Sequence, residues 1–140
     1  MERRYLLDTN IILFISINPK ELTRKVQQIL DDYGNLFYVS TTSVKEIIHL
    51  YNSGKIKKAK KWKTSKDIIL DIETSNFRLL PVTREHLLTY AALSTPTWHN
   101  DPNDHIIISQ AIAEGMFLIS SDRKFEQYID QDLHFIFNDR

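Results

Sequence analysis

Four acidic residues stand at points of the sequence from which they could share a metal ion. Asp8 comes directly after the apolar run Tyr5-Leu6-Leu7, and Asp122 follows a second apolar run by three residues. Glu46 and Asp104 each fall in the first turn of a predicted helix. Carboxylates clustered without a cationic side chain are electrostatically costly, and a hard divalent cation, which prefers oxygen ligands, relieves that cost. The pattern therefore predicts metal-dependent hydrolysis of a phosphodiester.

The spacing of apolar residues, helix caps and breakers predicts strands that alternate with helices. Strands are expected at residues 4–7, 36–39, 77–80, 116–119 and 134–137. Helices are expected at residues 11–16, 19–34, 43–52, 56–74, 83–93, 102–115 and 123–128. This alternation indicates an α/β fold with a mostly parallel sheet of four to five strands, covered by helices on both faces.

Such a fold explains how acids so far apart in sequence meet. Ligands of an open parallel sheet gather at the carboxyl edge of its strands. Asp8 and Asp122 follow strands, and the crossover helices that carry Glu46 and Asp104 begin at that same edge because they run antiparallel to the strands. The positive end of each helix dipole also helps Glu46 and Asp104 stay ionised. We expect all four carboxylates on one rim.

Each acid also has a purely structural interpretation as a helix cap. Ser43-Val44-Lys45-Glu46 fits a capping box. Asp101-Pro102-Asn103-Asp104 fits an N-cap followed by proline at the first helical position. Asp122 and Asp8 could likewise cap the helices that follow them. Capping, however, requires no common location for the four side chains, whereas a metal site does.

Composition restricts the class of protein. The 140 residues contain no cysteine, which excludes disulfides, zinc–thiolate sites and thiol nucleophiles. The N-terminal apolar stretch, interrupted by Asp8 and Asn10, is too short to span a bilayer and too polar for a signal-peptide core. We expect a single domain over residues 1–140, cytoplasmic and without a membrane partner.

Formal net charge is zero, but the charges are unevenly distributed. The segment from 55 to 66 holds no acid and has lysines at 55, 57, 58, 60, 61, 63 and 66. Such a strip could hold a phosphate backbone, and equally could be a solvated helix face. Lys57, Lys58 and Lys61 are candidate contacts to RNA or to a partner. Trp62 could stack on a base or anchor the core.

The histidines give a weaker signal. His99 and His105 flank the acidic loop, so they could touch substrate, with His105 the candidate RNA contact; ordinary surface roles would also account for them. His49 follows Glu46 at the spacing of a di-iron ligand motif, but only one such motif exists here, which favours packing or surface exposure for His49.

Four segments resemble the PIN-domain nucleases, in particular the VapC-like toxins of type II toxin–antitoxin systems. They occur in the family's order and span nearly the whole chain: Leu6-Leu7-Asp8-Thr9-Asn10, Ser43-Val44-Lys45-Glu46-Ile47, Asn100-Asp101-Pro102-Asn103-Asp104-His105-Ile106-Ile107-Ile108-Ser109-Gln110-Ala111 and Leu118-Ile119-Ser120-Ser121-Asp122-Arg123-Lys124-Phe125. Two positions depart from the family pattern: the family often has an aromatic residue where Asn103 stands and a basic residue where His105 stands.

The resemblance implies a PIN-like α/β/α sandwich and an endoribonuclease dependent on Mg²⁺ or Mn²⁺, which cleaves RNA through metal-activated water. It maps catalytic metal ligands onto Asp8, Glu46, Asp104 and Asp122. Supporting roles fall to Thr9, Asp101 and Ser120. It also implies a cognate antitoxin that blocks the site, and a homodimer.

Two rival functions remain open on sequence alone. Asp8-Thr9-Asn10 resembles half of the motif of a phosphatase with an aspartyl nucleophile, although Asn10 cannot act as the general acid. The second rival is a non-catalytic PIN-like module that binds RNA or protein. Metal-dependent RNA cleavage would distinguish all three.

Overall fold

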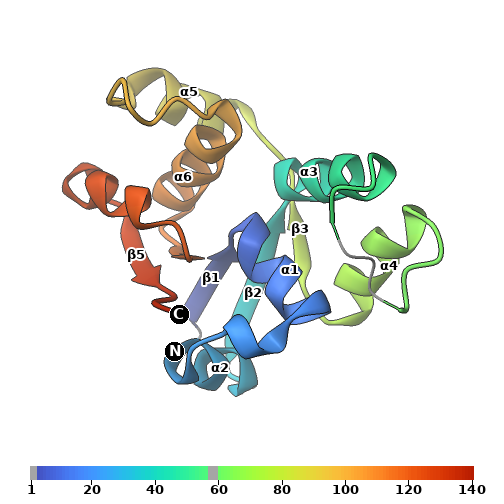
Figure 1. Cartoon of the computed structure of the whole chain (residues 1–140). Helices are drawn as coiled ribbons and strands as arrows, with labels where there is room; N and C mark the ends of the chain where they lie inside the picture. The colour runs from blue at the N-terminus through green and yellow to red at the C-terminus, as the bar shows by residue number, and fades with distance from the viewer. Residues whose placement is uncertain (1–2, 57–59) are drawn as a thin grey trace.

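A five-stranded parallel sheet forms the centre of the molecule (Figure 1). The structure, a computed structural model, describes residues 3–56 and 60–140. The strand order is β3-β2-β1-β4-β5, and every neighbouring pair is parallel. The strands are β1 (Arg3–Leu7), β2 (Asn35–Ser40), β3 (Arg78–Leu80), β4 (Phe117–Ser120) and β5 (His134–Phe137). The predicted α/β fold is confirmed.

Helices connect the strands and cover both faces of the sheet. They are α1 (Thr9–Ile17), α2 (Arg24–Asp31), α3 (Thr41–Asn52), α4 (Lys66–Thr74), α5 (Arg84–Ala92) and α6 (Pro102–Glu114), with 3₁₀ segments η1 (Pro19–Glu21) and η2 (Arg123–Gln131). In the described part of the chain, no helix combines the length and apolarity needed to cross a membrane.

The alternation of side chains along β1 divides the core into two layers. Tyr5 and Leu7 point to one face, where they pack with apolar residues of α1 to α4. Leu6 points to the other face and packs with residues of α6 and η2. Tyr5, Leu6 and Leu7 are buried on both faces of the sheet, so this second half of β1 is a continuous apolar run.

The strand order reverses at β1, and this places a crevice at its carboxyl end. The chain passes from β1 to β2 on one side, and β4 later joins β1 on the other side. The backbone N–H of Asp8 donates to the carbonyl of Ile119 at 3.0 Å, so Asp8 stands where β1 and β4 end together. Ligands of doubly wound sheets bind at such a switch point.

The single helix expected over residues 19–34 is wrong. After η1 the chain is extended at Leu22, and Thr23 then caps α2 by accepting from the N–H of Val26 at 3.2 Å. The side chain of buried Asn138 forms hydrogen bonds with two backbone groups that a continuous helix would pair internally. It accepts from the N–H of Thr23 at 2.7 Å and donates to the carbonyl of Glu21 at 2.8 Å.

The long helix expected over residues 56–74 is also wrong. Helix α4 begins at Lys66, the preceding residues 60–65 form turns and bends, and residues 57–59 lie outside the described part of the chain. The carbonyl of Trp62 accepts from the hydroxyl of Tyr51 at 3.2 Å, and the Trp62 ring is buried. Neighbouring lysines also disfavour a helix through repulsion between like charges three and four residues apart.

Candidate metal and nuclease site

Asp8 is the most deeply buried of the four acids. It is 4% exposed, and its side chain accepts two hydrogen bonds. Oδ1 accepts from the N–H of Thr9 at 2.8 Å, which caps α1, and Oδ2 accepts from the hydroxyl of Ser120 at 2.7 Å. These two bonds fix the carboxylate between the ends of β1 and β4.

Glu46 is brought beside Asp8 by helix α3. Its Oε1 accepts from the hydroxyl of Thr9 at 2.9 Å, and that hydroxyl also lies 3.0 Å from the hydroxyl of buried Ser43. Thr9, the residue directly after Asp8, therefore connects the start of α1 to Glu46. Asn103 of α6 also forms a side-chain hydrogen bond with Glu46.

The capping box predicted for Glu46 is wrong, and so is its placement in the first turn. Helix α3 begins at Thr41, because the hydroxyl of Ser40 caps it by accepting from the N–H of Thr42 at 3.1 Å. Ser43 is thus inside the helix, and Glu46 lies in the second turn. The structural interpretation of Glu46 as a cap is thereby excluded.

Asp104 projects from the first turn of α6, as expected. Asp101 caps this helix by accepting from the N–H groups of Asn103 at 3.0 Å and Asp104 at 3.4 Å. Oδ2 of Asp104 lies 3.0 Å from Nε2 of His99. Beyond the position of His99 near the acidic loop, nothing in the sequence indicated this contact.

Asp122 and Ser120 complete the rim on the β4 side. Oδ1 of Asp122 caps η2 by accepting from the N–H of Lys124 at 3.0 Å, and the N–H of Asp122 donates to the hydroxyl of Ser120 at 3.0 Å. Asn10 reaches the same hydroxyl with Nδ2 at 3.5 Å and accepts from the N–H of Ser121 at 3.3 Å. Asn10 belongs to the leading motif and is an additional support that the sequence did not single out.

The acids influence one another electrostatically. Burial, together with the charges of Asp104 and Glu46, raises the pKa of Asp8 to about 7 against the opposing hydrogen bonds. Burial likewise raises the pKa of Asp104 to about 7, with contributions from Asp101, Asp122 and Glu46. The pKa of Glu46 is raised, first by burial and also by Asp101. Three carboxyl groups thus hold their protons more tightly than isolated acids do.

This donor set fits a hard divalent cation. All the ligands offered are carboxylate oxygens, and the nearby cationic side chains Lys45 and Lys124 offset only part of the repulsion. Within residues 3–56 and 60–140, no three acidic or histidine side chains converge closely enough to ligate one ion together. Mg²⁺ suits such an arrangement because it commonly keeps several waters and takes only one or two carboxylates.

Two of the four acids serve as caps and also lie at the rim. Asp8 and Asp122, like the neighbouring Asp101, each accept from a backbone N–H at the start of a helix. Capping uses Oδ1 of Asp8 and Oδ1 of Asp122, and it fixes the rotamer of each side chain. A role in helix capping and a role in metal binding are therefore compatible for these acids.

The predicted RNA contact of His105 is wrong. It is 4% exposed, and Nε2 donates to the carbonyl of His99 at 2.8 Å, so the ring packs inward from α6 and does not reach the surface. Lys57 and Lys58 lie outside the described residues. Lys61 is exposed but pairs with Asp71 at 2.9 Å.

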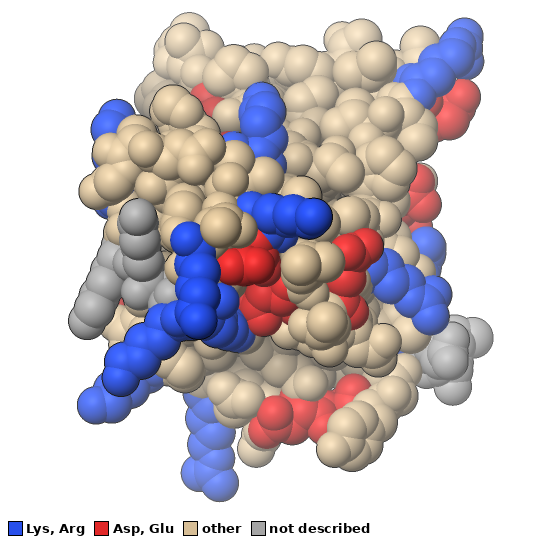
Figure 2. Space-filling view, turned by 90° about the vertical axis from the view of Figure 1, so that its right-hand side faces the viewer, with Lys and Arg blue, Asp and Glu red and all other residues tan. Residues whose placement is uncertain are grey.

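The surface around α4 is mixed in charge. Figure 2 shows the side of the molecule that carries α4, where Lys and Arg side chains surround a group of Asp and Glu side chains. Trp62 is 3% exposed and its Nε1 donates to Asp71 at 3.0 Å, so it anchors the core and does not present a stacking surface.

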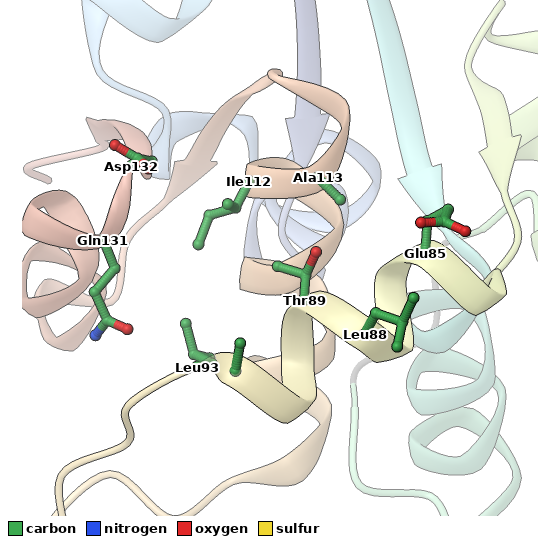
Figure 3. Close-up of a pocket in the computed structure, with 9 residues that line it drawn as sticks. Glu85, Leu88, Thr89, Leu93, Ile112, Ala113, Gln131 and Asp132 are labelled. Atoms are coloured by element: carbon green, nitrogen blue, oxygen red, sulfur yellow. The ribbon is translucent and has the colours of Figure 1, made fainter.

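Two hollows differ in their relation to the acids. One of about 340 Å³ is lined by Glu46 with Lys45, His49, Leu50 and Asn103, and so opens beside the site. Another of about 640 Å³ lies between α5, α6 and the end of η2, and its lining mixes apolar side chains such as Leu88 and Ile112 with polar ones such as Glu85 and Gln131 (Figure 3). None of the four acids lines this second hollow.

Comparison of the sequence with models of known protein families finds a match over most of the chain. The model of the PIN domain family matches residues 5–130. No curated protein matches the sequence. Among solved structures, VapBC2 from Rickettsia felis, bound to a DNA fragment from its promoter, is 21% identical with a TM-score of 0.67, and the match covers 97% of this chain and 99% of that one.

Two further solved structures have the same fold. VapBC-1 from nontypeable Haemophilus influenzae is 22% identical, with a TM-score of 0.66 and coverage of 98% of this chain and 99% of that one. VapBC-5 from Mycobacterium tuberculosis, described as a member of the VapBC family of toxin–antitoxin systems, is 15% identical. Its TM-score is 0.56, with 96% of each chain covered.

Proposed function

The chain belongs to the PIN domain family, and from that premise we propose that it is a Mg²⁺- or Mn²⁺-dependent endoribonuclease acting as the toxin of a toxin–antitoxin pair. One observation carries the proposal. Asp8 and Asp104, which lie far apart in the sequence, both have a pKa near 7 because they are buried and face other acids. Buried carboxyls that repel one another at a switch point are suited to a divalent cation.

The chain's own residues supply the framework for this chemistry. Asp8, Glu46, Asp104 and Asp122 would hold the cation, in part through water. Ser120 and Thr9 fix the carboxylates of Asp8 and Glu46 by the hydrogen bonds they donate. When bound, the cation lowers the pKa of water and stabilises charge on the phosphodiester.

The hollow beside Glu46 offers space for the substrate. Lys45 lies at this hollow with its Nζ 3.4 Å from Oδ1 of Asn103, so a positive charge and an amide stand next to the carboxylates. A phosphate attracts the ammonium, and an amide can pair with a base edge or a ribose hydroxyl. The resemblance of the four motifs to the VapC-like toxins favours RNA over DNA as the substrate.

An antitoxin partner is part of the same proposal. Of the solved structures, VapBC-5 is described as a member of a family of toxin–antitoxin systems, and VapBC2 as bound to a DNA fragment from its promoter. A second protein that covers the acidic rim would keep a nuclease of this kind inactive. A homodimer, which is implied by the resemblance, would present two such rims to one RNA.

Cleavage of defined RNA oligonucleotides by the purified protein tests the proposal. We expect cleavage in Mn²⁺ or Mg²⁺ that EDTA abolishes, and a loss of more than about 100-fold in Asp8→Asn, since even residues that only support a metal ligand contribute about 10- to 100-fold. A single-stranded DNA of the same sequence serves as the substrate control.

Two results would overturn the proposal. Cleavage that survives EDTA would exclude the metal. Intact RNA in Mn²⁺, with the protein folded and binding the same oligonucleotide, would instead favour the non-catalytic binding module.

A further inference from the structure

His99 occupies a buried position between a tyrosine and one of the four acids. It is 2% exposed. Nε2 lies 3.0 Å from Oδ2 of Asp104, and Nδ1 lies 2.8 Å from the hydroxyl of Tyr128, which is itself fully buried in η2. Both ring nitrogens therefore have a partner, and the ring connects η2 to the first turn of α6.

The backbone of His99 is also fixed. Its carbonyl accepts from Nε2 of His105 at 2.8 Å, and the two imidazoles pack edge to face at 4.9 Å between centroids. Phe125 packs on another side of the His99 ring at 5.9 Å. A residue held on its ring and on its backbone has one available orientation, so it can determine where Asp104 lies.

The partners fix the direction of each hydrogen bond. A neutral imidazole has one protonated nitrogen, which donates, and one bare nitrogen, which accepts, and the two nitrogens of His99 face Tyr128 at 2.8 Å and Asp104 at 3.0 Å. An ionised Asp104 can only accept, so Nε2 must carry the ring proton and donate. Nδ1 then accepts from Tyr128. The chain of donors runs from Tyr128 through His99 to Asp104.

We propose that His99 is a positioning residue for Asp104: it holds Oδ2 through Nε2–H, with its tautomer set by Tyr128, and so would leave the other carboxylate oxygen to bind the cation. The inference rests on the proposed metal site. Carboxylates that bind metals are commonly held in place by hydrogen bonds from outer residues, and loss of such a partner costs about 10- to 100-fold in metal affinity or activity.

Two substitutions of His99 separate positioning from packing. The amide nitrogen of Gln reaches about as far as Nε2, whereas that of Asn reaches only about as far as Nδ1. His99→Gln can therefore keep the donor to Asp104, and His99→Asn cannot. We expect the Kd for Mn²⁺, measured by calorimetry, to rise by about 10-fold or more in His99→Asn and by clearly less in His99→Gln.

Tyr128→Phe tests the other end of the chain of donors and keeps the ring that packs in the core. It should weaken Mn²⁺ binding in the same direction as His99→Asn, because Nδ1 loses its donor and the Nε2–H tautomer is no longer selected. This variant also preserves the test if His99→Asn fails to fold. RNA cleavage by each folded variant should recover partly at high Mn²⁺, which a loss of packing alone would not produce.

The outcomes separate this inference from the proposed function. A wild-type Kd for Mn²⁺ in both His99→Asn and Tyr128→Phe would overturn the positioning role, as would a wild-type protein that binds no Mn²⁺. Wild-type protein that binds Mn²⁺ with the expected order of Kd values, but cleaves no RNA, would support the positioning role and overturn only the nuclease.

Discussion

Single residues at this rim combine roles that are usually considered separately. Asp8 caps α1 with one oxygen and accepts from Ser120 with the other, yet its pKa is near 7 because it is buried among acids. The hydrogen bonds fix its geometry, while burial and repulsion make its ionised form costly. The proposed cation would offset that cost and leave the cap in place.

Stability of the metal-free protein should therefore fall as pH rises. Asp8 and Asp104 have a pKa of about 7 when folded, against an ordinary value of 3.8. Between about pH 4 and pH 7 the folded state binds more protons than the unfolded state, so the free energy of unfolding decreases with pH through this range. Urea unfolding in EDTA measures the slope.

Asp8→Asn should flatten that slope and add about 1 to 3 kcal/mol to the metal-free stability at pH 7, since each pKa unit corresponds to about 1.4 kcal/mol and the acids share the effect. Asp31→Asn, an exposed change on α2, is the matched control and should leave the slope as in wild type. A metal-free protein whose stability rises from pH 4 to pH 7 would contradict the burial of these charges.

Glu46→Gln separates chemistry from folding. Glu46 caps no helix, and the Oε1 of Gln can still accept from Thr9. We expect the free energy of unfolding to stay within about 0.5 kcal/mol of wild type and RNA cleavage to fall by about 100-fold or more. Chemical denaturation and an oligonucleotide assay measure the two effects, with Glu73→Gln on α4 as control. Full cleavage by Glu46→Gln would remove Glu46 from the site.

At the scale of elements, the buried ring of Trp62 attaches the lysine-rich segment before α4 to the core. Trp62 is buried and donates to Asp71, which also pairs with Lys61. The neighbouring Lys60 and Lys63 are exposed. Their charges are therefore available to a polyanion, whereas the charge of Lys61 is partly neutralised.

Replacing Lys60, Lys63 and Lys66 together by Gln should weaken RNA binding and reduce the slope of log K against log salt by about one unit for each phosphate that the protein no longer binds. Fluorescence anisotropy at several salt concentrations, with Asp8→Asn to prevent cleavage, measures the slope. Lys20, Lys25 and Arg24 changed to Gln form the control set. An unchanged slope would make the segment a solvated surface.

The whole molecule brings the acids together through its topology. Asp8 and Asp122 follow adjacent strands, while Glu46 and Asp104 come from helices α3 and α6 that contact each other across the switch point. The two apolar layers hold the sheet between them, so the rim is built directly on the core. A site carried by strand and helix ends is well suited to fixed metal geometry.

Expression in a bacterium without a partner should arrest growth, because the proposed activity cleaves RNA. Asp8→Asn should be tolerated at equal soluble levels, and co-expression of a cognate antitoxin should restore growth to cells with the wild-type protein. Colony counts and total RNA on denaturing gels measure both effects. Normal growth with abundant folded wild-type protein would argue against a toxin.

Sequence alone predicted the strands and most of the helices, and it named the four acids that the proposed site requires. Apolar runs, caps and breakers are local signals, so β5 and α6 could be predicted nearly to the residue. The convergence of the acids also followed, because parallel strands place their carboxyl ends at one edge. The family resemblance added two expectations, RNA as the substrate and Mg²⁺ as the cofactor.

Tertiary contacts decided the rest. Asn138, from the far end of the chain, interrupts the helix expected over residues 19–34. Burial turns His105 inward, whereas the early start of α3, which frees Glu46 from capping, comes from a local cap by Ser40. His99 meets Tyr128 and Asp104 only because η2 packs on α6. These hydrogen bonds join residues whose contacts have no sequence period, so only the folded chain reveals them.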